Sequence, residues 1–396
     1  MATTPLLPLA GMNTAAEDAA LLRGGDVPRV YVRDAVNIDM TPAGKASLRG
    51  SLAQVSDTPY RHLWQSPLHG DVFATLGADW VKVNLADWSH EVLATVGEGD
   101  VAHELLNNRV CVAAPAGIFT FDGNGAQRLT LDTPAPPLLI AGAGSLPAGT
   151  YGAAVAWLRG QQESAPSAIA FAEVAELGGL SLTLPLCLDA SVTGARLYLT
   201  RHNGGEPLLA GDYPLHTPTI ELPLLPELGR DAPLRHLSPM PSGKYLKYWR
   251  GRLLSAKANV LRWSESLAYH LHDERHGFMQ MPQRITFVEP VEGGIWLGQV
   301  DHVVFLAGTA PEALSVERKA ARTPVPGSAV QMAAELAGGD VAEGGAPVVV
   351  WLAENGYVMG TSSGAIVEVQ GGVMSGISAQ GGTSVVLDRR LITAVN

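Results

Sequence analysis

The stretch Arg33–Gly50, R-D-A-V-N-I-D-M-T-P-A-G-K-A-S-L-R-G, decides the fold class of this 396-residue chain. Its first half alternates apolar residues (Val36, Ile38, Met40) with polar ones and runs into a Thr-Pro-Ala-Gly turn. A second, polar-leaning strand then ends at Gly50. Period-2 alternation on both sides of a Pro/Gly turn predicts a β-hairpin in which Gly44 is free to take a positive φ.

The same strand-turn-strand design recurs along most of the chain. Each unit has an apolar strand, a turn of Gly, Asn, Asp or Ala, and a second apolar strand, and several add a third strand after another Gly turn. The units are Asp71–Asn84, Arg109–Leu131, Arg252–Trp263, Gly294–Leu306, Val348–Val369 and Ser384–Val395. Such a repeat, with few helical patterns between the units, predicts an all-β fold, a β-propeller of about six to seven blades.

One segment breaks this rhythm after the Pro-rich border Thr133–Pro137. Strands are predicted there at Gly149–Trp157, Leu180–Leu184, Ala195–Thr200 and Thr219–Leu222. Roughly 100 residues with frequent turn signals are typical of a fibronectin-III or immunoglobulin-like β-sandwich, here inserted between two blades. The predicted domains are an N-terminal arm with a short helix (1–28), the first propeller blades (29–132), the inserted sandwich (133–236) and the remaining blades (237–396).

Two stretches have helical signals. Thr14–Leu22 has a Thr cap, a Glu three residues later and a run of Ala, which predicts a capping box and a short helix within the arm. Pro311–Ala320 begins with Pro at its permitted first position and predicts one or two further turns.

Composition restricts the class of protein. With 46% hydrophobic and 16% charged residues the chain is expected to be globular, and 44 glycines and 27 prolines supply many turns. A net charge of −11 argues against a protein that grips nucleic acid through its phosphates, but it suits a passage that DNA only traverses. Cys111 and Cys187 lie in apolar runs and are predicted to be buried, inert thiols.

The N-terminus and the apolar runs bear on location. The first residues lack a basic region and their apolar run is broken by Pro, so no signal peptide is predicted. No window approaches 18 uninterrupted apolar residues, so no membrane-spanning helix is expected. The expectation is a soluble protein of a reducing compartment, or a component assembled there.

The best candidate for a metal site is His270, His272 and His276, in Y-H-L-H-D-E-R-H-G-F. On a strand the first two histidines would share a face, and on a helix the last two would, as zinc-binding pairs require. Their flanking residues read as a loop, which favours imidazoles that bond the backbone or the solvent.

Three further sets have both a chemical and a structural interpretation. Paired carboxylates could hydrolyse glycosides, but Asp beside Gly or at strand ends is mostly turn chemistry. Tryptophans spaced one or two per blade could form a sugar platform, but core packing is favoured. A basic cluster among aromatics superficially suits nucleic acid, but the overall acidity favours a strand edge or subunit contact. The aspartates are Asp34, Asp39, Asp71, Asp79 and Asp87, and the tryptophans are Trp64, Trp80, Trp88, Trp249, Trp263, Trp296 and Trp351. The basic cluster is Arg235, Lys244, Lys247, Arg250 and Arg252, interleaved with Tyr245, Tyr248 and Trp249.

Catalytic and nucleotide-binding motifs are missing from the sequence. No G-x-S-x-G elbow or P-loop occurs, and in the nearest approach to a dinucleotide motif, at Gly142–Gly144, Pro147 stands where the third glycine is needed. We therefore expect neither an enzyme nor a bound cofactor, and no catalytic, cofactor-binding or metal-binding residue is assigned.

Two stretches resemble a known family. G-M-N-T followed by R-D-A-V-N-I-D-M-T-P-A-G-K-A-S-L-R-G is similar to the first blade of tail nozzle and hub proteins of short-tailed bacteriophages. The stretch Trp249–Ser266, followed by D-E-R-H-G-F and R-I-T-F-V, also looks like a blade of such proteins. The matches cover about a third of the chain, which is shorter than the larger nozzle proteins.

The resemblance implies a structural virion protein, assembled in the host cytoplasm. Identical β-propeller subunits would form a ring at the distal end of the tail, extend the channel through which DNA is ejected and anchor an adaptor, fibres or a needle. Subunit contacts are expected at blade edges, at the N-terminal arm or at the insert, because exposed edges otherwise pair without control. The alternatives are a carbohydrate-binding or carbohydrate-cleaving propeller and a cellular adaptor whose propeller binds peptides.

Overall fold

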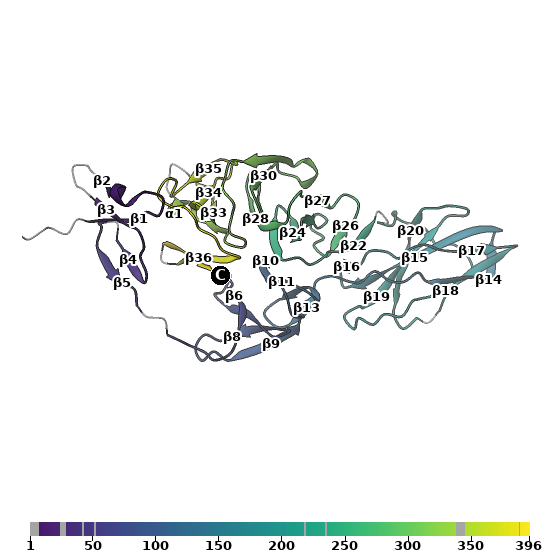
Figure 1. Cartoon of the computed structure of the whole chain (residues 1–396). Coiled ribbons are helices and arrows are strands. Elements are labelled where there is room, and N and C mark those ends of the chain that lie inside the picture. The colour runs from purple at the N-terminus through teal and green to yellow at the C-terminus, as the bar shows by residue number, and fades with distance from the viewer. Residues whose placement is uncertain are drawn as a thin grey trace, which may run out of the picture.

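The computed structural model describes residues 8–23, 29–41, 43–50, 53–217, 219–233, 236–337, 345–387 and 389–396. Within these ranges the chain is built from strands, and its helices are limited to two 3-10 turns and the four-residue α1 (Ala334–Ala337). The predicted all-β class is therefore confirmed. Figure 1 shows an elongated molecule with a central body and a smaller unit at either end.

The central body contains five four-stranded antiparallel sheets. The first two are β6 (Arg61–Gln65), β7 (Val72–Leu76), β8 (Asp79–Val83) and β9 (His90–Thr95), then β10 (Ala102–Leu106), β11 (Arg109–Ala114), β12 (Gly117–Phe121) and β13 (Ala126–Arg128). The third is β23 (Tyr245–Trp249), β24 (Arg252–Lys257), β25 (Val260–Trp263) and β27 (Phe278–Gln280). The fourth and fifth are β28 (Ile285–Val291), β29 (Gly294–Gln299), β30 (Val303–Ala307) and β31 (Ser315–Lys319), then β32 (Val330–Met332), β33 (Val348–Ala353), β34 (Gly356–Gly360) and β35 (Ile366–Glu368).

The sixth sheet has two strands, β36 (Gly382–Leu387) and β37 (Arg390–Val395). A further pair, β22 (Leu237–Pro239) and β26 (Leu271–Asp273), lies beside the third sheet. All six units predicted as strand-turn-strand therefore contain the predicted strands, because each alternates apolar residues on both sides of a turn.

Successive sheets pack face to face through apolar cores. Trp80 of the first sheet packs in one core with Val112 of the second, and Cys111 of the second packs in another with Leu253 of the third. Trp296 of the fourth sheet and Trp351 of the fifth are fully buried in a shared core, with ring centroids 5.5 Å apart. Buried aromatic side chains therefore supply much of the contact between neighbouring sheets.

The unit at one end of the molecule is a two-sheet module, which the chain forms after the second four-stranded sheet and before the third. One sheet has the order β14-β18-β21 and the other β16-β15-β19-β20, with β17 paired to β15. Leu180, Leu182, Tyr151 and Leu197 from the two sheets are buried in one core. The strands are β14 (Leu138–Leu146), β15 (Gly149–Arg159), β16 (Gln162–Glu163), β17 (Ala170–Val174), β18 (Gly178–Thr183), β19 (Gly194–Thr200), β20 (Pro207–Pro214) and β21 (Thr219–Leu222).

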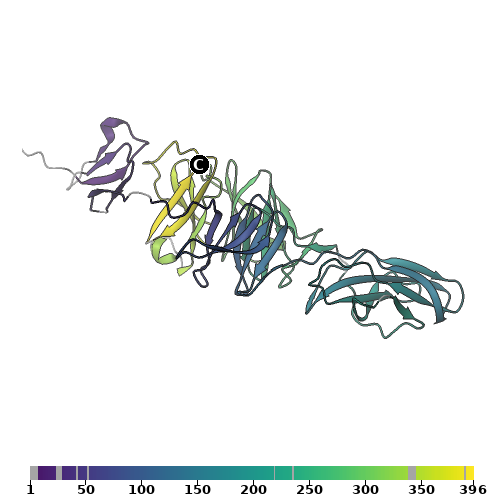
Figure 2. The same ribbon diagram turned by 90° about the horizontal axis from the view of Figure 1, so that it is seen from below.

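The module is fixed to the central body by hydrogen bonds. Arg159 Nη2 and Gln162 Nε2 both donate to the carbonyl oxygen of Leu129, at 2.9 and 2.6 Å. His270 Nε2 donates to the carbonyl oxygen of Glu163 at 2.8 Å. These contacts, on two separate segments of the body, restrain the direction in which the module projects (Figure 2).

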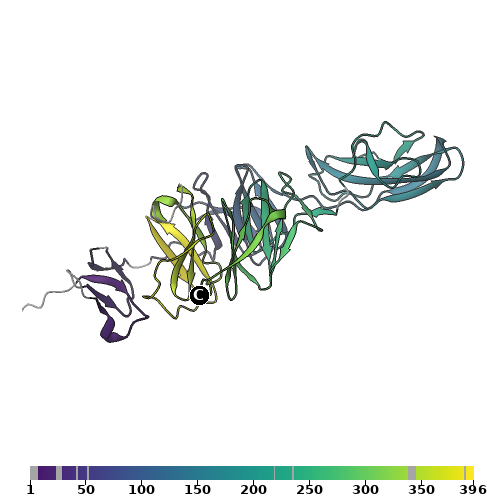
Figure 3. The same ribbon diagram turned by 90° about the horizontal axis from the view of Figure 1, so that it is seen from above.

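The unit at the other end comprises β1 (Leu9–Met12), β2 (Leu22–Arg23), β3 (Arg29–Val32), β4 (Ile38–Met40) and β5 (Ala46–Leu48). It lies on the opposite side of the body from the two-sheet module (Figure 3). Thr14 joins it to the segment before β36: the Thr14 amide donates to the Val373 carbonyl and the Ser375 amide donates to Thr14 Oγ1, both at 2.9 Å.

Several boundaries differ from the sequence prediction. β3 pairs with β1 and β2, so the N-terminal unit continues past residue 28. The hairpin predicted in Arg33–Gly50 is present as β4–β5, with Gly44 at φ +82°, but it forms a sheet of its own rather than part of the first four-stranded sheet.

Both helix predictions were too long. Only Asp18–Ala20 of Thr14–Leu22 is helical, and it is a 3-10 turn. Its N-cap is Glu17, which makes no capping hydrogen bond through its side chain, and Asn13 instead accepts hydrogen bonds from the amides of Ala15 and Ala16 in the turn before it. Pro311–Ala313 is likewise a 3-10 turn, and the residues after it form β31. Short helical sequences without an apolar face to pack do not sustain an α-helix.

Candidate functional site

The candidate site is a cavity of about 1330 Å³ in the central body. Residues of β6, β10, β23, β28 and β32, the first strand of each four-stranded sheet, line it together with residues of β36 and β37. The first strands of all the sheets therefore face one common space, which is the usual place for a site in a radial β architecture.

A buried ion pair lies at the wall of this cavity. Lys247 Nζ of β23 lies 2.7 Å from Glu289 Oε1 of β28, and Glu289 is 4% exposed. Burial raises the pKa of Glu289 and the charge of Lys247 opposes this rise. Burial acts to lower the pKa of Lys247, but the charges of Glu289 and Glu104 outweigh it and the pKa is raised. The lysine is therefore held as a cation between sheets three and four.

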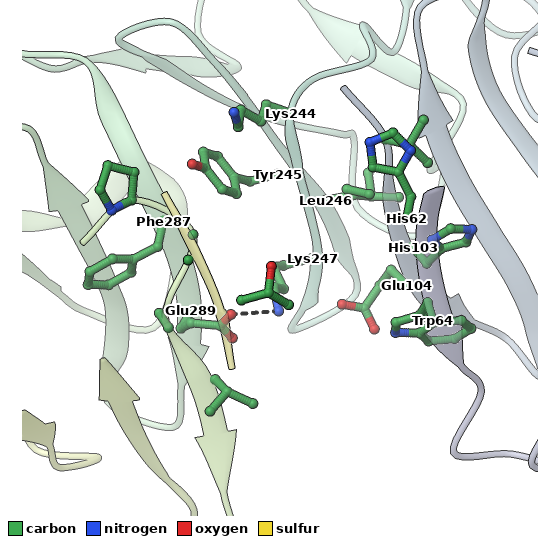
Figure 4. A pocket seen from close by; sticks show the side chains of 18 of the residues that line it. His62, Trp64, His103, Glu104, Lys244, Tyr245, Leu246, Lys247, Phe287 and Glu289 are labelled. Carbon is green, nitrogen blue, oxygen red and sulfur yellow. Dashed lines mark ion pairs between the residues drawn. The ribbon is translucent and has the colours of Figure 1, made fainter. Parts of the chain in front are cut away.

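Glu104 of β10 extends the pair to a third sheet. Figure 4 shows its carboxylate pointing toward Lys247 from the opposite wall. Its Oε1 accepts a hydrogen bond from the Leu105 amide at 2.8 Å. Burial raises the pKa of Glu104, against the opposing charge of Lys247. The ammonium group of Lys247 thus forms an ion pair with Glu289 and is also affected by the charge of Glu104. Glu289 Oε2 is buried without a hydrogen-bond partner among the described residues.

His103 and Trp64 line the neighbouring wall, and the buried Trp80 contacts His103. Trp80 Nε1 donates to His103 Nε2 at 3.1 Å, which requires that this nitrogen carry no proton. The rings of Trp64 and His103 stack nearly parallel, 5.3 Å apart. Burial, together with the charge of His62, lowers the pKa of His103 to about 3. His103 is therefore neutral near pH 7.

The histidines proposed for a metal do not converge. His270 bonds the backbone of the two-sheet module, as described above. His272, 2% exposed, donates through Nδ1 to the Trp263 carbonyl at 3.1 Å. His276 Nδ1 lies 3.3 Å from Asp273 Oδ2. The described residues contain no group of three His, Cys, Asp or Glu side chains arranged to hold a metal ion, and the two backbone contacts agree with the interpretation favoured from sequence.

The aspartates proposed as paired carboxylates are dispersed, and most are engaged locally. Asp39 pairs with Arg49 at 2.8 Å and Asp71 with Lys82 at 3.1 Å. Asp79 accepts a hydrogen bond from Thr95, and Asp87 from Ser89. Asp34 is exposed in the connection before β4. None of the five lines the cavity.

Most of the tryptophans are core residues. Trp80, Trp296 and Trp351 are fully buried, and Trp249 and Trp263 are each 4% exposed. This confirms the packing interpretation for these five residues. Trp88 contacts Tyr60 on the first sheet, whereas Trp64 lines the cavity.

The described members of the basic cluster make polar contacts within the chain, and three of them form ion pairs. Lys244 pairs with Asp100 at 3.2 Å and Arg252 with Glu312 at 2.8 Å, and Lys247 forms the buried pair. Arg250 donates to the Glu292 carbonyl at 2.7 Å; Arg235 lies outside the described residues.

The two thiols differ in burial. Cys111 is fully buried, and burial raises the pKa of its thiol, so the prediction of an inert thiol holds there. Cys187 is half-buried, and both thiols are free. No described helix is long and apolar enough to cross a membrane.

Sequence reasoning named Lys247 only as part of the basic cluster and missed Glu104 and Glu289. Glu289 does leave a signal, because it is a single charge inside the apolar strand I-T-F-V-E-P-V, every residue of which is buried. Charged residues are seldom fully buried unless paired. That rule predicts a partner for Glu289 but cannot say that a lysine of the preceding sheet supplies it.

Comparisons with known proteins give no family. No family model and no curated protein matches the chain. Similar solved structures include KlHsv2 with loop 6CD replaced by a Gly-Ser linker (6% identity, 85% of this chain and 89% of that chain covered, TM-score 0.31). Others are BBS1N in complex with ARL6DN (10%, 85% and 90%, 0.34) and apo AztD from Citrobacter koseri (10%, 79% and 87%, 0.26). At these scores the likenesses carry no argument about function.

Proposed function

We propose that this chain is a structural virion protein that forms a homo-oligomeric ring at the distal part of a phage tail. The ring extends the DNA-ejection channel and anchors fibres or other tail parts. In this proposal the central body is a six-bladed propeller whose last blade has two strands, and residues 138–222 form an inserted fibronectin-like sandwich.

The observation that carries the proposal is the presence of two β units joined to opposite ends of one central body. The two-sheet module is joined through Leu129 and His270, and the N-terminal unit through Thr14 and Ser375. An architecture with separate surfaces at each end suits a part that contacts neighbours on several sides. The resemblance of Arg33–Gly50 and Trp249–Ser266 to tail proteins supports the same role.

The charges of the cavity also suit a structural part. Lys247 is held by a carboxylate at 2.7 Å and His103 by an indole at 3.1 Å, so these groups link neighbouring sheets. The channel for DNA would be formed by the ring of copies, whose acidic surface would adhere weakly to phosphate.

Negative-stain microscopy of the purified protein and of virions tests this proposal. We expect closed rings in solution, and the chain at the tail tip when virions are labelled with an antibody against it. A strictly monomeric particle that is absent from virions would contradict the proposal.

A carbohydrate-binding role is the second candidate, favoured by one observation. Trp64, Tyr245, Glu104 and Glu289 all line the same cavity, and aromatic rings beside carboxylates are groups that sugar sites use. A glycan array combined with a hydrolysis assay tests it, with Glu104→Gln as the matched variant. Neither binding nor turnover by the wild-type protein would remove this candidate.

A further inference from the structure

The sixth sheet lacks half of the strands that the others have. β36 and β37 pair with each other, whereas each of the five preceding sheets has four strands. One face of this hairpin packs on the fifth sheet, where Leu391 contacts the core around Val350 and Tyr357 donates to Thr393 Oγ1 at 2.9 Å. No described strand pairs with the other edge of β37.

Apolar side chains of the β36–β37 hairpin are exposed to solvent. Val385, Leu387 and Ile392 are 52%, 56% and 44% exposed. Val385 and Ile392 are cross-strand partners, so they lie side by side on the face away from Leu391. An unpaired strand with exposed apolar residues is a template for pairing with another strand.

The N-terminal unit carries a second two-stranded hairpin that belongs to no larger sheet. β4 and β5 pair only with each other among the described strands, and Leu48 is 83% exposed. A two-stranded sheet is marginal in isolation and gains stability by joining a larger one. Joining the two hairpins would give a sheet of four strands, the size of each of the other five sheets in the body.

The two hairpins also have complementary charges. Asp39 of β4 lies 3.4 Å from Arg390 at the start of β37, with exposed fractions of 28% and 66%. If these two side chains are neighbours on one face of a joined sheet, Ile38 and Met40 fall on the face of Leu391, because alternate residues point to opposite sides. The apolar side of β4 would then continue the side that packs on the fifth sheet.

Within one chain this contact stays incomplete. The Asp39–Arg390 ion pair is solvent-exposed, and such pairs contribute about 0–1 kcal/mol. No strand pairing accompanies it among the described residues. Residues 49–60 connect β5 to β6, and twelve residues span up to about 40 Å when extended. Because residues 33–37 tie the hairpin to β3, the hairpin reaches a second copy together with the whole N-terminal unit, whose Thr14 then contacts the Val373–Ser375 segment of that copy.

We propose that β37 of one copy pairs with the β4–β5 hairpin of a second copy of this chain, which completes the sixth sheet to four strands. In each copy the free edge of β37 and the β4–β5 hairpin lie next to each other, in contact through Asp39 and Arg390, so the proposed contact exchanges the hairpin between copies. Such a head-to-tail interface is heterologous and generates a ring when the rotation closes. The inference rests on the proposed homo-oligomeric ring and assigns its subunit contact.

Charge reversal on separate copies tests this contact. Asp39→Arg and Arg390→Asp are prepared as two differently tagged proteins, and their oligomeric state is measured by size-exclusion chromatography with light scattering at low salt. Each variant alone is expected to lose most of the oligomer, because like charges meet at every contact. An equimolar mixture is expected to regain it and to co-purify on either tag, since each contact then joins opposite charges.

The outcomes separate this contact from the ring itself. Glu98→Arg, a charge reversal on an exposed residue outside both hairpins, serves as the control and should leave the oligomer intact. An oligomeric wild type whose assembly ignores both reversals overturns the proposed contact and leaves the ring standing. The proposed contact is also overturned if the mixture stays monomeric while the double variant Asp39→Arg/Arg390→Asp behaves as wild type. The ion pair would then form within one chain. A wild type that is monomeric at every concentration overturns the ring as well.

Discussion

Burial decides how single charged residues act in this protein. Glu289 is enclosed by apolar strands, with 6% of its side chain exposed, and its partner Lys247 is 28% exposed, whereas in the neighbouring pair the side chains of Lys244 and Asp100 are 39% and 58% exposed. A buried ion pair is costly to break from one side, because the remaining charge has no solvent. An exposed pair contributes little. The same residue type therefore has different roles three positions apart.

Lys247→Met is expected to destabilise the protein by about 3–5 kcal/mol, since it leaves Glu289 buried without its cation. Lys244→Met, the matched control, should change stability by less than about 1 kcal/mol. Chemical denaturation monitored by tryptophan fluorescence measures both. The double variant Lys247→Met/Glu289→Leu should recover most of the loss, and equal effects of the two single lysine variants would show that the pair is not buried in solution.

The lowered pKa of His103 predicts that the folded protein loses stability at acidic pH. Its folded pKa of about 3 lies below the ordinary value of 6.5, so below pH 6.5 the unfolded chain binds a proton that the folded chain does not. Stability present above pH 6.5 is therefore lost as the pH falls toward 3, at up to about 1.4 kcal/mol per pH unit.

Unfolding free energies measured between pH 7 and pH 5 check this prediction. His103→Gln should remove about 2 kcal/mol of the wild-type pH dependence across this range. His216→Gln, at an exposed position of the two-sheet module, serves as the control. A wild-type slope that His103→Gln leaves unchanged would contradict the prediction.

At the scale of elements, close packing between neighbouring sheets is set by small residues opposite large ones. A Cβ at Gly360 of β34 would lie 2.4 Å from the ring of Trp296 on the fourth sheet. The indole itself donates through Nε1 to the Thr361 carbonyl at 2.9 Å, which fixes its position. The glycine is therefore required by the neighbouring aromatic ring and not by the strand.

Gly360→Ala should destabilise the protein by about 1–3 kcal/mol through overpacking. Gly125→Ala is the control, because its Cβ would meet no heavy atom within 4 Å, and its effect should stay within about 0.5 kcal/mol. Thermal denaturation of the two variants provides the comparison. Equal melting temperatures would mean that the fourth and fifth sheets are less closely packed than described.

The elements also mark the limit of prediction from sequence. Strands flanked by Gly turns, such as Arg109–Ala114 and Gly117–Phe121, were predictable because period-2 alternation and turn chemistry are local. The Ala-rich run after Thr14 was misleading, because helix formation depends on a packing face that the sequence does not show. The Glu104–Lys247–Glu289 cluster was not predictable, because its members meet only when three separate sheets converge.

At the scale of the whole molecule, the joint proposed above and the two-sheet module lie at opposite ends of the body (Figures 2 and 3). The module has its own buried core, made by Leu180, Tyr151 and other residues of its two sheets. The five four-stranded sheets pack through cores that contain no residue of β14–β21, and the apolar contact between module and body is made by Leu131, which is buried with Trp157 and Ala195. The module and the body should therefore fold independently.

Replacing residues 133–236 with a short Gly-Ser linker is expected to leave the body folded and the oligomeric state unchanged. The physical reason is that β37 and the β4–β5 hairpin remain intact, so the head-to-tail contact can still close the ring. Circular dichroism establishes that the shortened chain is folded, and light scattering compares its mass with that of the full chain. A folded but monomeric deletion variant would move the subunit contact to the two-sheet module. A variant that keeps its rings but is no longer incorporated into virions would instead assign the module to contacts with other tail proteins.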